Sequence, residues 1–194
     1  LILVVKPWKV KDIIKEIKDE IPFRCKQVVS IAAGVTTGNV TEWLGCEMPV
    51  YYVIPNTAIS IRRSMTFIAY KNADAEQLET VKSIFGELGT TLVIEEKQMK
   101  ACMALASCGI AYAMRYVRAN VEGAVELGIS PSDATMITSN TMKGAAELLL
   151  STGNHPEAEI DKVTTPGGLT IKGLNALEAN GFTNAVIEAL TASI

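Results

Sequence analysis

Histidine is almost absent from this sequence, and its scarcity excludes much common catalytic chemistry. The 194 residues contain one histidine, His155. A Ser-His-Asp triad could use only this residue, and in the stretch Gly-Asn-His-Pro-Glu-Ala-Glu a helix-capping or packing role fits it better than that of a base. The motifs His-Glu-x-x-His and Cys-x-x-Cys and paired catalytic carboxylates are also missing. Metal-dependent hydrolysis and glycosidase chemistry are therefore poorly supported.

Blocks of one charge and long apolar runs are missing as well. The 18 basic and 21 acidic residues give a net charge of -3, and no run of lysines or arginines forms a block. Nucleic acid is therefore not expected as a partner. The hydrophobic fraction is 48%, yet no segment reaches the roughly 18 apolar residues that a membrane span needs. The longest uncharged run, Ala101–Met114, predicts a helix buried within the protein or against a second subunit.

Cysteines are few and show no metal-binding pattern. Cys25, Cys46, Cys102 and Cys108 have no paired spacing, which indicates reduced thiols in a cytoplasmic protein. The opening Leu-Ile-Leu-Val-Val-Lys-Pro-Trp lacks the layout of a signal peptide and predicts a buried strand that leads into a loop. We expect a chain of this kind to begin in the middle of a fold.

Residues 1 to 95 alternate between short apolar runs and amphipathic stretches, as α/β domains do. The predicted strands are Leu1–Val5, Gln27–Ile31, Val50–Ile54, Met65–Ala69 and Thr91–Ile94. The predicted helices are Val10–Glu20, Asn39–Leu44 and Ala75–Leu88. This rhythm predicts right-handed crossovers and a largely parallel sheet.

After Glu95 the composition turns to alanine, methionine, leucine and glutamate in helical patterns. The predicted helices are Lys97–Leu127 with a break near Gly109, Ser132–Ser151, Glu157–Val163, Ile171–Asn180, and Asn184 to the end. The sequence therefore predicts an α/β part over residues 1–95 and an all-helical part over residues 96–194.

Three segments follow predicted strands in the α/β part. They are Val5–Pro7, Ala32–Thr36 and Ile54–Thr57. In open parallel sheets nucleotides and substrates bind beyond the carboxyl ends of the strands. Small residues there let a ring or a ribose approach the backbone, and Asn56 offers a donor and an acceptor. The alternative is that these are the small and polar residues found after the strands of any sheet.

A Pro166-Gly167-Gly168 turn stands directly before a predicted helix. Glycines leave the backbone bare, and the first N–H groups of a helix have no intrahelical partner, so this segment could hold an anion. An ordinary turn with Thr164, Thr165 or Thr170 as the helix cap is the alternative.

These segments together resemble pyrroline-5-carboxylate reductases. The resemblance is carried by Val-Lys-Pro-Trp (residues 5–8), Val-Val-Ser-Ile-Ala-Ala-Gly-Val-Thr (residues 28–36), Ile-Pro-Asn-Thr (residues 54–57) and the stretch from Asn154 to Leu190. It covers essentially the whole chain. It implies a Rossmann-like domain, N-terminally incomplete here, followed by a helical dimerisation domain. The implied activity is reduction of a cyclic imine to L-proline with NADP(H) or NAD(H), in proline biosynthesis.

The resemblance also implies roles for particular residues. The substrate carboxylate would bind backbone N–H groups of Gly168, Leu169 and Thr170, in a loop that Thr165 and Gly167 help to shape, with the Thr170 hydroxyl at the ring nitrogen as the catalytic contact. Val5, Lys6 and Pro7 would line the adenosine side of the cofactor. Ala32, Ala33, Gly34 and Asn56 would lie toward its ribose and nicotinamide. The partner would be a second copy of the chain, interlocked through the helical part.

This sequence departs from the family pattern in several places. It contains no Gly-x-Gly-x-x-Gly turn for the cofactor pyrophosphate. The residues that would contact the ribose 2′ position and distinguish NADP from NAD belong to the same missing segment. Cys108, Ile110 and Ala58 replace a small residue and two prolines, which bears on substrate fit. Two alternatives stay open: a helical oligomerisation module without catalysis, and a related imine or β-hydroxyacid reductase.

Overall fold

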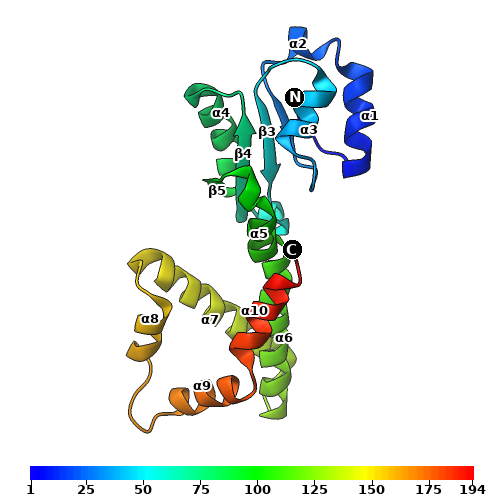
Figure 1. The fold of residues 1–194 in the computed structure, drawn as a ribbon. Coiled ribbons are helices and arrows are strands. Elements are labelled where there is room, and N and C mark those ends of the chain that lie inside the picture. The colour runs from blue at the N-terminus through cyan, green and yellow to red at the C-terminus, as the bar shows by residue number, and fades with distance from the viewer. The chain divides into compact units, whose positions relative to one another are not determined.

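The computed structural model describes residues 1–194, with the backbone alone at residues 23 and 24. The chain divides into two compact units, residues 1–110 with Ile194, and residues 111–193 (Figure 1). No helix among the described residues is both long and apolar enough to cross a membrane.

The first unit is built on a five-stranded sheet in the order β1-β2-β3-β4-β5. The strands are β1 Ile2–Leu3, β2 Val28–Ser30, β3 Val50–Ile54, β4 Ser64–Lys71 and β5 Gly89–Val93. Strands β1, β2 and β3 are parallel, β4 is antiparallel to β3, and β5 is parallel to β4. The predicted, largely parallel sheet is thus observed. Strand β4 runs the other way because a short connection, including the 3₁₀ turn η1 (Thr57–Ile61), returns the chain directly beside β3.

Helices cover both faces of this sheet. The helices are α1 Pro7–Ile17, α2 Ile21–Arg24, α3 Thr37–Leu44 and α4 Ala75–Gly86. On one face Val28 and Val50 pack with Val10 of α1 and Val40 of α3. On the other face the neighbouring side chains of β2 and β3 pack against α4 (Figure 1). Because strand side chains alternate, the same strands supply both cores.

The segment after β5 packs on the sheet before the chain enters the helical unit. It comprises η2 Glu96–Gln98, α5 Met99–Met103 and the π-helical turn η3 Ala104–Cys108. Met99 lies in one cluster with Tyr52, Ile54 and Phe67. The predicted division at residue 95 follows the change in composition, whereas these contacts keep residues 96–110 with the sheet. The predicted break near Gly109 is the π-helical turn.

The second unit consists of helices only. They are α6 Gly109–Glu126, α7 Pro131–Thr152, α8 Pro156–Lys162, α9 Leu169–Ala179 and α10 Phe182–Thr191. Among the described residues after Gly109, only Val121 and Ala134 are buried hydrophobics. Many large apolar side chains are exposed, among them Met114, Leu127, Met136 and Leu150. This unit therefore buries little of its apolar surface within one chain.

The run Ala101–Met114 was predicted to be buried, and within one chain this is true of only part of it. Ala104 is buried, whereas Leu105 and Met114 are each 65% exposed. The side chains left exposed belong to the uncharged stretch for which the sequence allowed burial against a second subunit.

Tyr51 of β3 is a buried tyrosine whose hydroxyl has no hydrogen-bond partner among the described residues. Its ring lies 6.2 Å from that of Tyr70, centroid to centroid, on the paired strand. Burial, and secondarily the charges of Asp74 and Tyr70, raise the pKa of Tyr51 to about 12. The buried phenol is thus kept neutral well into the alkaline range.

We expect Tyr51→Phe to fold normally and to match or exceed the unmodified chain in stability, because no hydrogen bond is lost. The pKa of Tyr51 is higher in the folded state than in the unfolded state. The neutral phenol therefore contributes to the free energy of unfolding below the unfolded pKa of about 10, and this contribution is lost as pH rises toward 12. Tyr51→Phe should therefore lose less stability than the unmodified chain between pH 9 and 11.5. Urea unfolding of both proteins across this range measures the effect, and parallel curves would contradict it.

Candidate functional site

The three predicted strand-end segments meet at one edge of the sheet. Because β1, β2 and β3 are parallel, their carboxyl ends share that edge. Val5 and Lys6 after β1 line a cavity of about 410 Å³ together with Ile31 from the end of β2. Pro7 is the first residue of α1. The three segments thus follow the carboxyl ends of parallel strands, where nucleotides commonly bind to open parallel sheets.

The segment after β2 is a tight turn. The N–H of Val35 donates to the carbonyl of Ala32 at 3.2 Å, and Gly34 at the third position has φ +81°. A side chain would be strained at that angle, which explains the glycine. Ala33 and Gly34 are exposed, while Ala32 is buried. The exposed backbone of this turn is the surface that a ring or a ribose could approach.

A tyrosine of the neighbouring strand holds this turn from beneath. The N–H of Gly34 donates to Tyr52 Oη at 2.8 Å, and Tyr52 itself is 4% exposed. Burial raises the pKa of Tyr52, an effect that the hydrogen bond from Gly34 partly opposes and the charge of Glu96 reinforces. The phenol therefore stays neutral and acts as a fixed acceptor under the turn.

Helix α3 starts directly after this turn. A carboxylate of the protein already neutralises the partial positive charge of its first N–H groups. Thr36 and Asn39 form a capping box. The Glu96 carboxylate accepts from the N–H of Thr37 at 3.2 and 3.3 Å and from its hydroxyl. A carboxylate at this position interacts favourably with the helix dipole. An external anion would have to compete with Glu96 for the N-terminus of α3.

Asn56 uses its amide inside the protein. Its Oδ1 accepts from the N–H of Ala58 at 3.1 Å and caps η1, and its Nδ2 donates to the carbonyl of Ala106 in the π-helical turn at 3.3 Å. The donor and acceptor noted in the sequence are therefore both engaged. Asn56 joins the end of β3 to the segment that leads into α6.

The glycine-rich loop lies in the helical unit and differs from expectation at one amide. The N–H of Gly168 donates to the carbonyl of Thr165 at 2.9 Å, closing a turn in which Gly167 has φ +72°. This amide was predicted to be free and is not. Leu169 and Thr170 are the first two residues of α9, where N–H groups lack intrahelical partners. No side chain caps α9 among the described residues. Its open N-terminus is thus formed by residues 169 and 170.

Gly168 is required for steric reasons. A Cβ built at this residue would lie 2.6 Å from Thr165 Oγ1 and 2.9 Å from the Thr165 carbonyl oxygen. Any larger residue would therefore displace Thr165 and open the turn. This close approach explains why Thr165 and Gly168 occur together.

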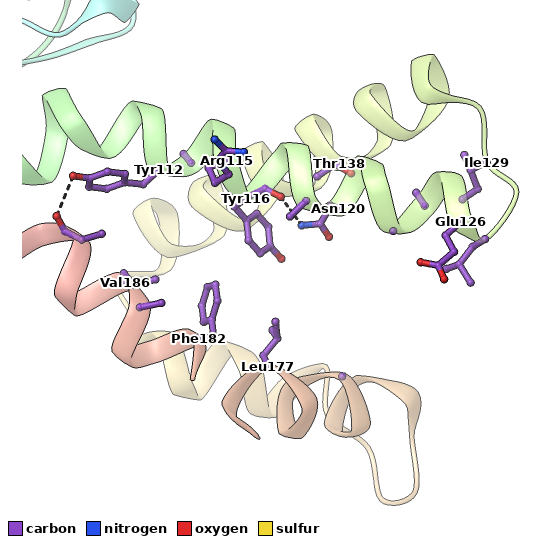
Figure 2. Close-up of a pocket in the computed structure, with 18 residues that line it drawn as sticks. Tyr112, Arg115, Tyr116, Asn120, Glu126, Ile129, Thr138, Leu177, Phe182 and Val186 are labelled. Atoms are coloured by element: carbon purple, nitrogen blue, oxygen red, sulfur yellow. Dashed lines mark hydrogen bonds between the residues drawn. The ribbon is translucent and has the colours of Figure 1, made fainter. Parts of the chain in front are cut away.

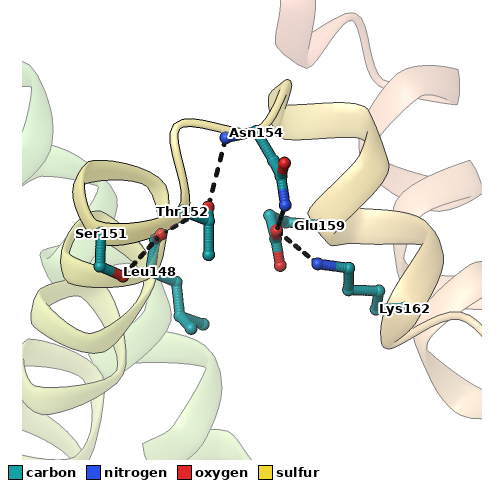
Figure 3. A network of polar contacts seen from close by, with 6 residues as sticks. All are labelled: Leu148, Ser151, Thr152, Asn154, Glu159 and Lys162. Carbon is teal, nitrogen blue, oxygen red and sulfur yellow. Dashed lines mark hydrogen bonds and ion pairs between the residues drawn. The ribbon is translucent and has the colours of Figure 1, made fainter.

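Helix α8 precedes this loop and is anchored at both ends. His155 caps it, with Nδ1 accepting from the N–H of Glu157 at 3.2 Å, as the sequence predicted. Figure 3 shows that Glu159 accepts from Lys162 and Asn154, each at 2.6 Å. These hydrogen bonds, that from Lys162 first, lower the pKa of Glu159. The Thr164 hydroxyl donates to the carbonyl of Ile160 at 2.8 Å, so the loop starts from a fixed helix end.

A large apolar groove runs along the helical unit (Figure 2). Its volume is about 1240 Å³, and it is lined by residues of α6, α7, α9 and α10. Tyr116 and Phe182 meet edge to face across it with ring centroids 6.2 Å apart. Tyr112 donates to the carbonyl of Ala189 at 3.1 Å and contacts the hydroxyl of Ser193, which ties α6 to α10. The groove is large even for a small-molecule site and is mostly apolar.

Two contributors were missed from the sequence. Tyr52 and Glu96 were not predicted to belong to the site, yet they hold the turn at Gly34 and the start of α3. A partial signal for Tyr52 was present, since a buried tyrosine hydroxyl usually finds a hydrogen-bond partner, although its neighbour Tyr51 has none among the described residues. Glu96 gave no signal, because its partner is 59 residues away. The described residues contain no cluster of His, Cys, Asp or Glu that could hold a metal ion.

Comparison with known proteins agrees with this arrangement. The family model described as pyrroline-5-carboxylate reductase dimerisation matches residues 96–194. Pyrroline-5-carboxylate reductases 1 and 2 of Dictyostelium discoideum are 37% and 36% identical; both alignments cover the whole chain, which spans 37% of the first relative and 69% of the second.

Solved structures place the whole described chain within the same fold. A pyrroline-5-carboxylate reductase of Coxiella burnetii superposes with a TM-score of 0.92 at 33% identity, over 99% of this chain and 72% of that one. The Plasmodium falciparum pyrroline carboxylate reductase with NADP bound gives 0.89 at 27% identity, over 99% and 73%. The Rossmann-like fold and the helical dimerisation domain are thereby confirmed, and the chain belongs to the pyrroline-5-carboxylate reductase family.

Proposed function

We propose that this chain reduces 1-pyrroline-5-carboxylate to L-proline with NADP(H) or NAD(H), the last step of proline biosynthesis. The observation that carries the proposal is the open N-terminus of α9 behind a glycine turn, in a chain that belongs to this family. A helix N-terminus with unpartnered amides attracts a carboxylate by hydrogen bonding and by its dipole. The substrate is a small acid of this kind.

In the proposed complex the carboxylate binds the N–H groups of Leu169 and Thr170. The turn from Thr165 through Gly167 to Gly168 supports these amides without itself donating through Gly168. Leu169 acts through its backbone, and its side chain is 85% exposed. The carboxylate would thus be held by main-chain groups whose positions follow from the helix.

Thr170 is proposed as the catalytic contact because its hydroxyl sits one residue inside the same helix start. The hydroxyl would hydrogen-bond the ring nitrogen while hydride adds to the imine carbon and a proton to the nitrogen. The reduced nicotinamide supplies the hydride, so the chain has to bind and orient rather than provide a strong base.

The cofactor is proposed to lie along the carboxyl edge of β1 to β3. Support comes from the cavity at Val5 and Lys6 and from the exposed turn at Ala33 and Gly34. The Plasmodium falciparum relative binds NADP. Val5, Lys6 and Pro7 would take the adenosine side, and Ala32 to Gly34 the ribose and nicotinamide. Asn56 would act by positioning the backbone, since its side chain is engaged internally.

A second copy of the chain is proposed to fill the apolar groove and interlock with it. The helical unit matches a dimerisation model, and few of its apolar residues are buried within one chain. A groove bordered by four helices can receive helices of a partner and bury that surface.

The four cysteines are free in the structure, which fits the proposed cytoplasmic location.

Thr170→Ala should lower kcat/KM for proline formation about ten- to hundredfold, because a hydrogen bond at the reacting nitrogen is lost. Thr183→Ala, which removes a hydroxyl bonded to Glu178 on the same unit, is the control and should leave turnover unchanged. Steady-state kinetics with the cyclic imine and NADPH measure both. Full turnover in Thr170→Ala would remove the role assigned to this hydroxyl. An unmodified chain that binds no NADPH would instead indicate a non-catalytic helical module.

Gly168→Ala should weaken L-proline binding at least tenfold, because the new Cβ collides with Thr165 and opens the turn. Gly86→Ala is the matched control, since a Cβ there meets open space at the end of α4. Calorimetric titration with L-proline tests the carboxylate site without any cofactor. Equal affinity in Gly168→Ala and the unmodified chain would argue against carboxylate binding at this loop.

Val186→Asp should shift the protein from dimer or larger assembly to monomer, because it places a charge in the apolar groove. Ile84→Asp on α4 is the control, as Ile84 is exposed to a similar degree and lies outside the helical unit. Sedimentation velocity distinguishes the two variants. A stable monomer of the unmodified chain would count against the interlocked pair.

A further inference from the structure

We propose that Tyr52 is a positioning residue for the nicotinamide cofactor, because its phenol sets the orientation of the peptide between Ala33 and Gly34. This inference rests on the proposed function and extends it to a residue outside the predicted site. In the proposed complex Tyr52 does not contact the cofactor. It acts through the turn above it, and the turn presents a carbonyl acceptor to the ligand.

The geometry starts from the hydrogen bond of Gly34. Its N–H points into the protein and donates to Tyr52 Oη at 2.8 Å. In a trans peptide the N–H and the preceding carbonyl point in opposite directions, and the structure contains no cis peptide bond among the described residues. The carbonyl of Ala33 is therefore directed away from Tyr52.

The carbonyl of Ala33 is available to a ligand. No hydrogen bond to it is found among the described residues, and both Ala33 and Gly34 are exposed. It follows the carboxyl end of β2, two residues after Ile31, which lines the cavity together with Lys6. A cofactor in this position offers matching donors, namely ribose hydroxyls and the nicotinamide carboxamide N–H. We infer that one of these donates to the Ala33 carbonyl.

The turn depends on Tyr52 because its own geometry permits another orientation. Gly34 has no side chain to restrict the peptide, so rotation of the Ala33–Gly34 peptide is sterically easy. The buried phenol removes this freedom. It is fixed on the central strand β3 and packs in one cluster with Met99 and Phe67, with its hydroxyl 3.8 Å from Met103 Sδ.

The other end of this turn segment, at Thr37, is held by a different residue. Glu96 binds the start of α3 at Thr37, and it belongs to the segment that also carries Met103. Residues 34 and 37 are thus both held by partners within the first unit, Tyr52 in the core and Glu96 half-buried in η2. A binding surface that is already ordered loses less entropy when its ligand arrives.

The test compares Tyr52→Phe with Tyr51→Phe. Both replace a buried tyrosine of β3 by the same residue, but the Tyr51 hydroxyl has no partner and that of Tyr52 accepts from Gly34. We expect Tyr52→Phe to raise the Kd and the KM for NADPH about three- to tenfold, with the KM for the imine unchanged. Tyr51→Phe should leave all three values as they are. Equal NADPH affinity in the two variants would overturn the proposal.

Amide hydrogen exchange of Gly34, followed by NMR, gives a second readout that does not depend on enzyme activity. The N–H should be protected in the unmodified chain, with and without NADPH, and should exchange at least tenfold faster in Tyr52→Phe. A Gly34 amide that loses protection when NADPH binds would overturn the proposal, because the N–H would then have left Tyr52. An unmodified chain that binds L-proline but no NADPH would refute cofactor binding and this inference, and leave the carboxylate loop standing.

Discussion

The central strand β3 is the constraint on which the first unit depends. All five of its residues are buried. The parallel strand β2 pairs with one of its edges and the antiparallel strand β4 with the other. Residues of even number pack toward α1, α3 and α5, and those of odd number toward α4. A shift of one residue in register would exchange Tyr51 and Tyr52 between these faces. Tyr52 would then no longer lie under the Gly34 turn, so the same register defines the core and the turn.

The second unit follows a different physical rule. Its helices have apolar faces but bury few of their residues within one chain, and they border a groove of about 1240 Å³. Hydrophobic burial normally stabilises a helical unit from within. Here much of the apolar surface stays exposed within one chain, in agreement with a matched dimerisation model. Helix capping by His155 and the hydrogen bonds at Glu159 hold the chain that leads to the glycine loop.

The loop before α9 and the turn after β2 use backbone amides in opposite ways. At α9 the amides of Leu169 and Thr170 remain open because none of the described side chains caps the helix. At α3 the corresponding position is closed by Glu96, and at Gly34 the amide is turned inward toward Tyr52. One helix start is therefore suited to an external carboxylate and the other is satisfied by the protein. Glycine occurs in both segments, so glycine content alone could not distinguish them.

Local patterns in the sequence determined much of this protein. Periodicity identified all five strands and the main helices, and several segments together, among them the one with the Pro-Gly-Gly motif, indicated the family. Short segments were missed, such as α2 and η1, because a few residues carry too little periodic signal. Local patterns did not show which hydrogen-bond partner each polar group would have. Gly168 could not be assigned to an internal turn, nor Glu96 to the start of α3, from local patterns alone.

Tertiary structure alone decided the pairing of Glu96 with Thr37, the direction of β4 and the partner of the Gly34 amide. The physical reason is that secondary structure follows from neighbours along the chain, whereas a buried hydrogen bond such as that between Thr37 and Glu96 joins residues 59 positions apart. Folding brings such groups together only after the sheet register has been set. The open amides of Leu169 and Thr170 at the start of a helix were thus predictable from the sequence, whereas the partners of Thr37 and Gly34 were not.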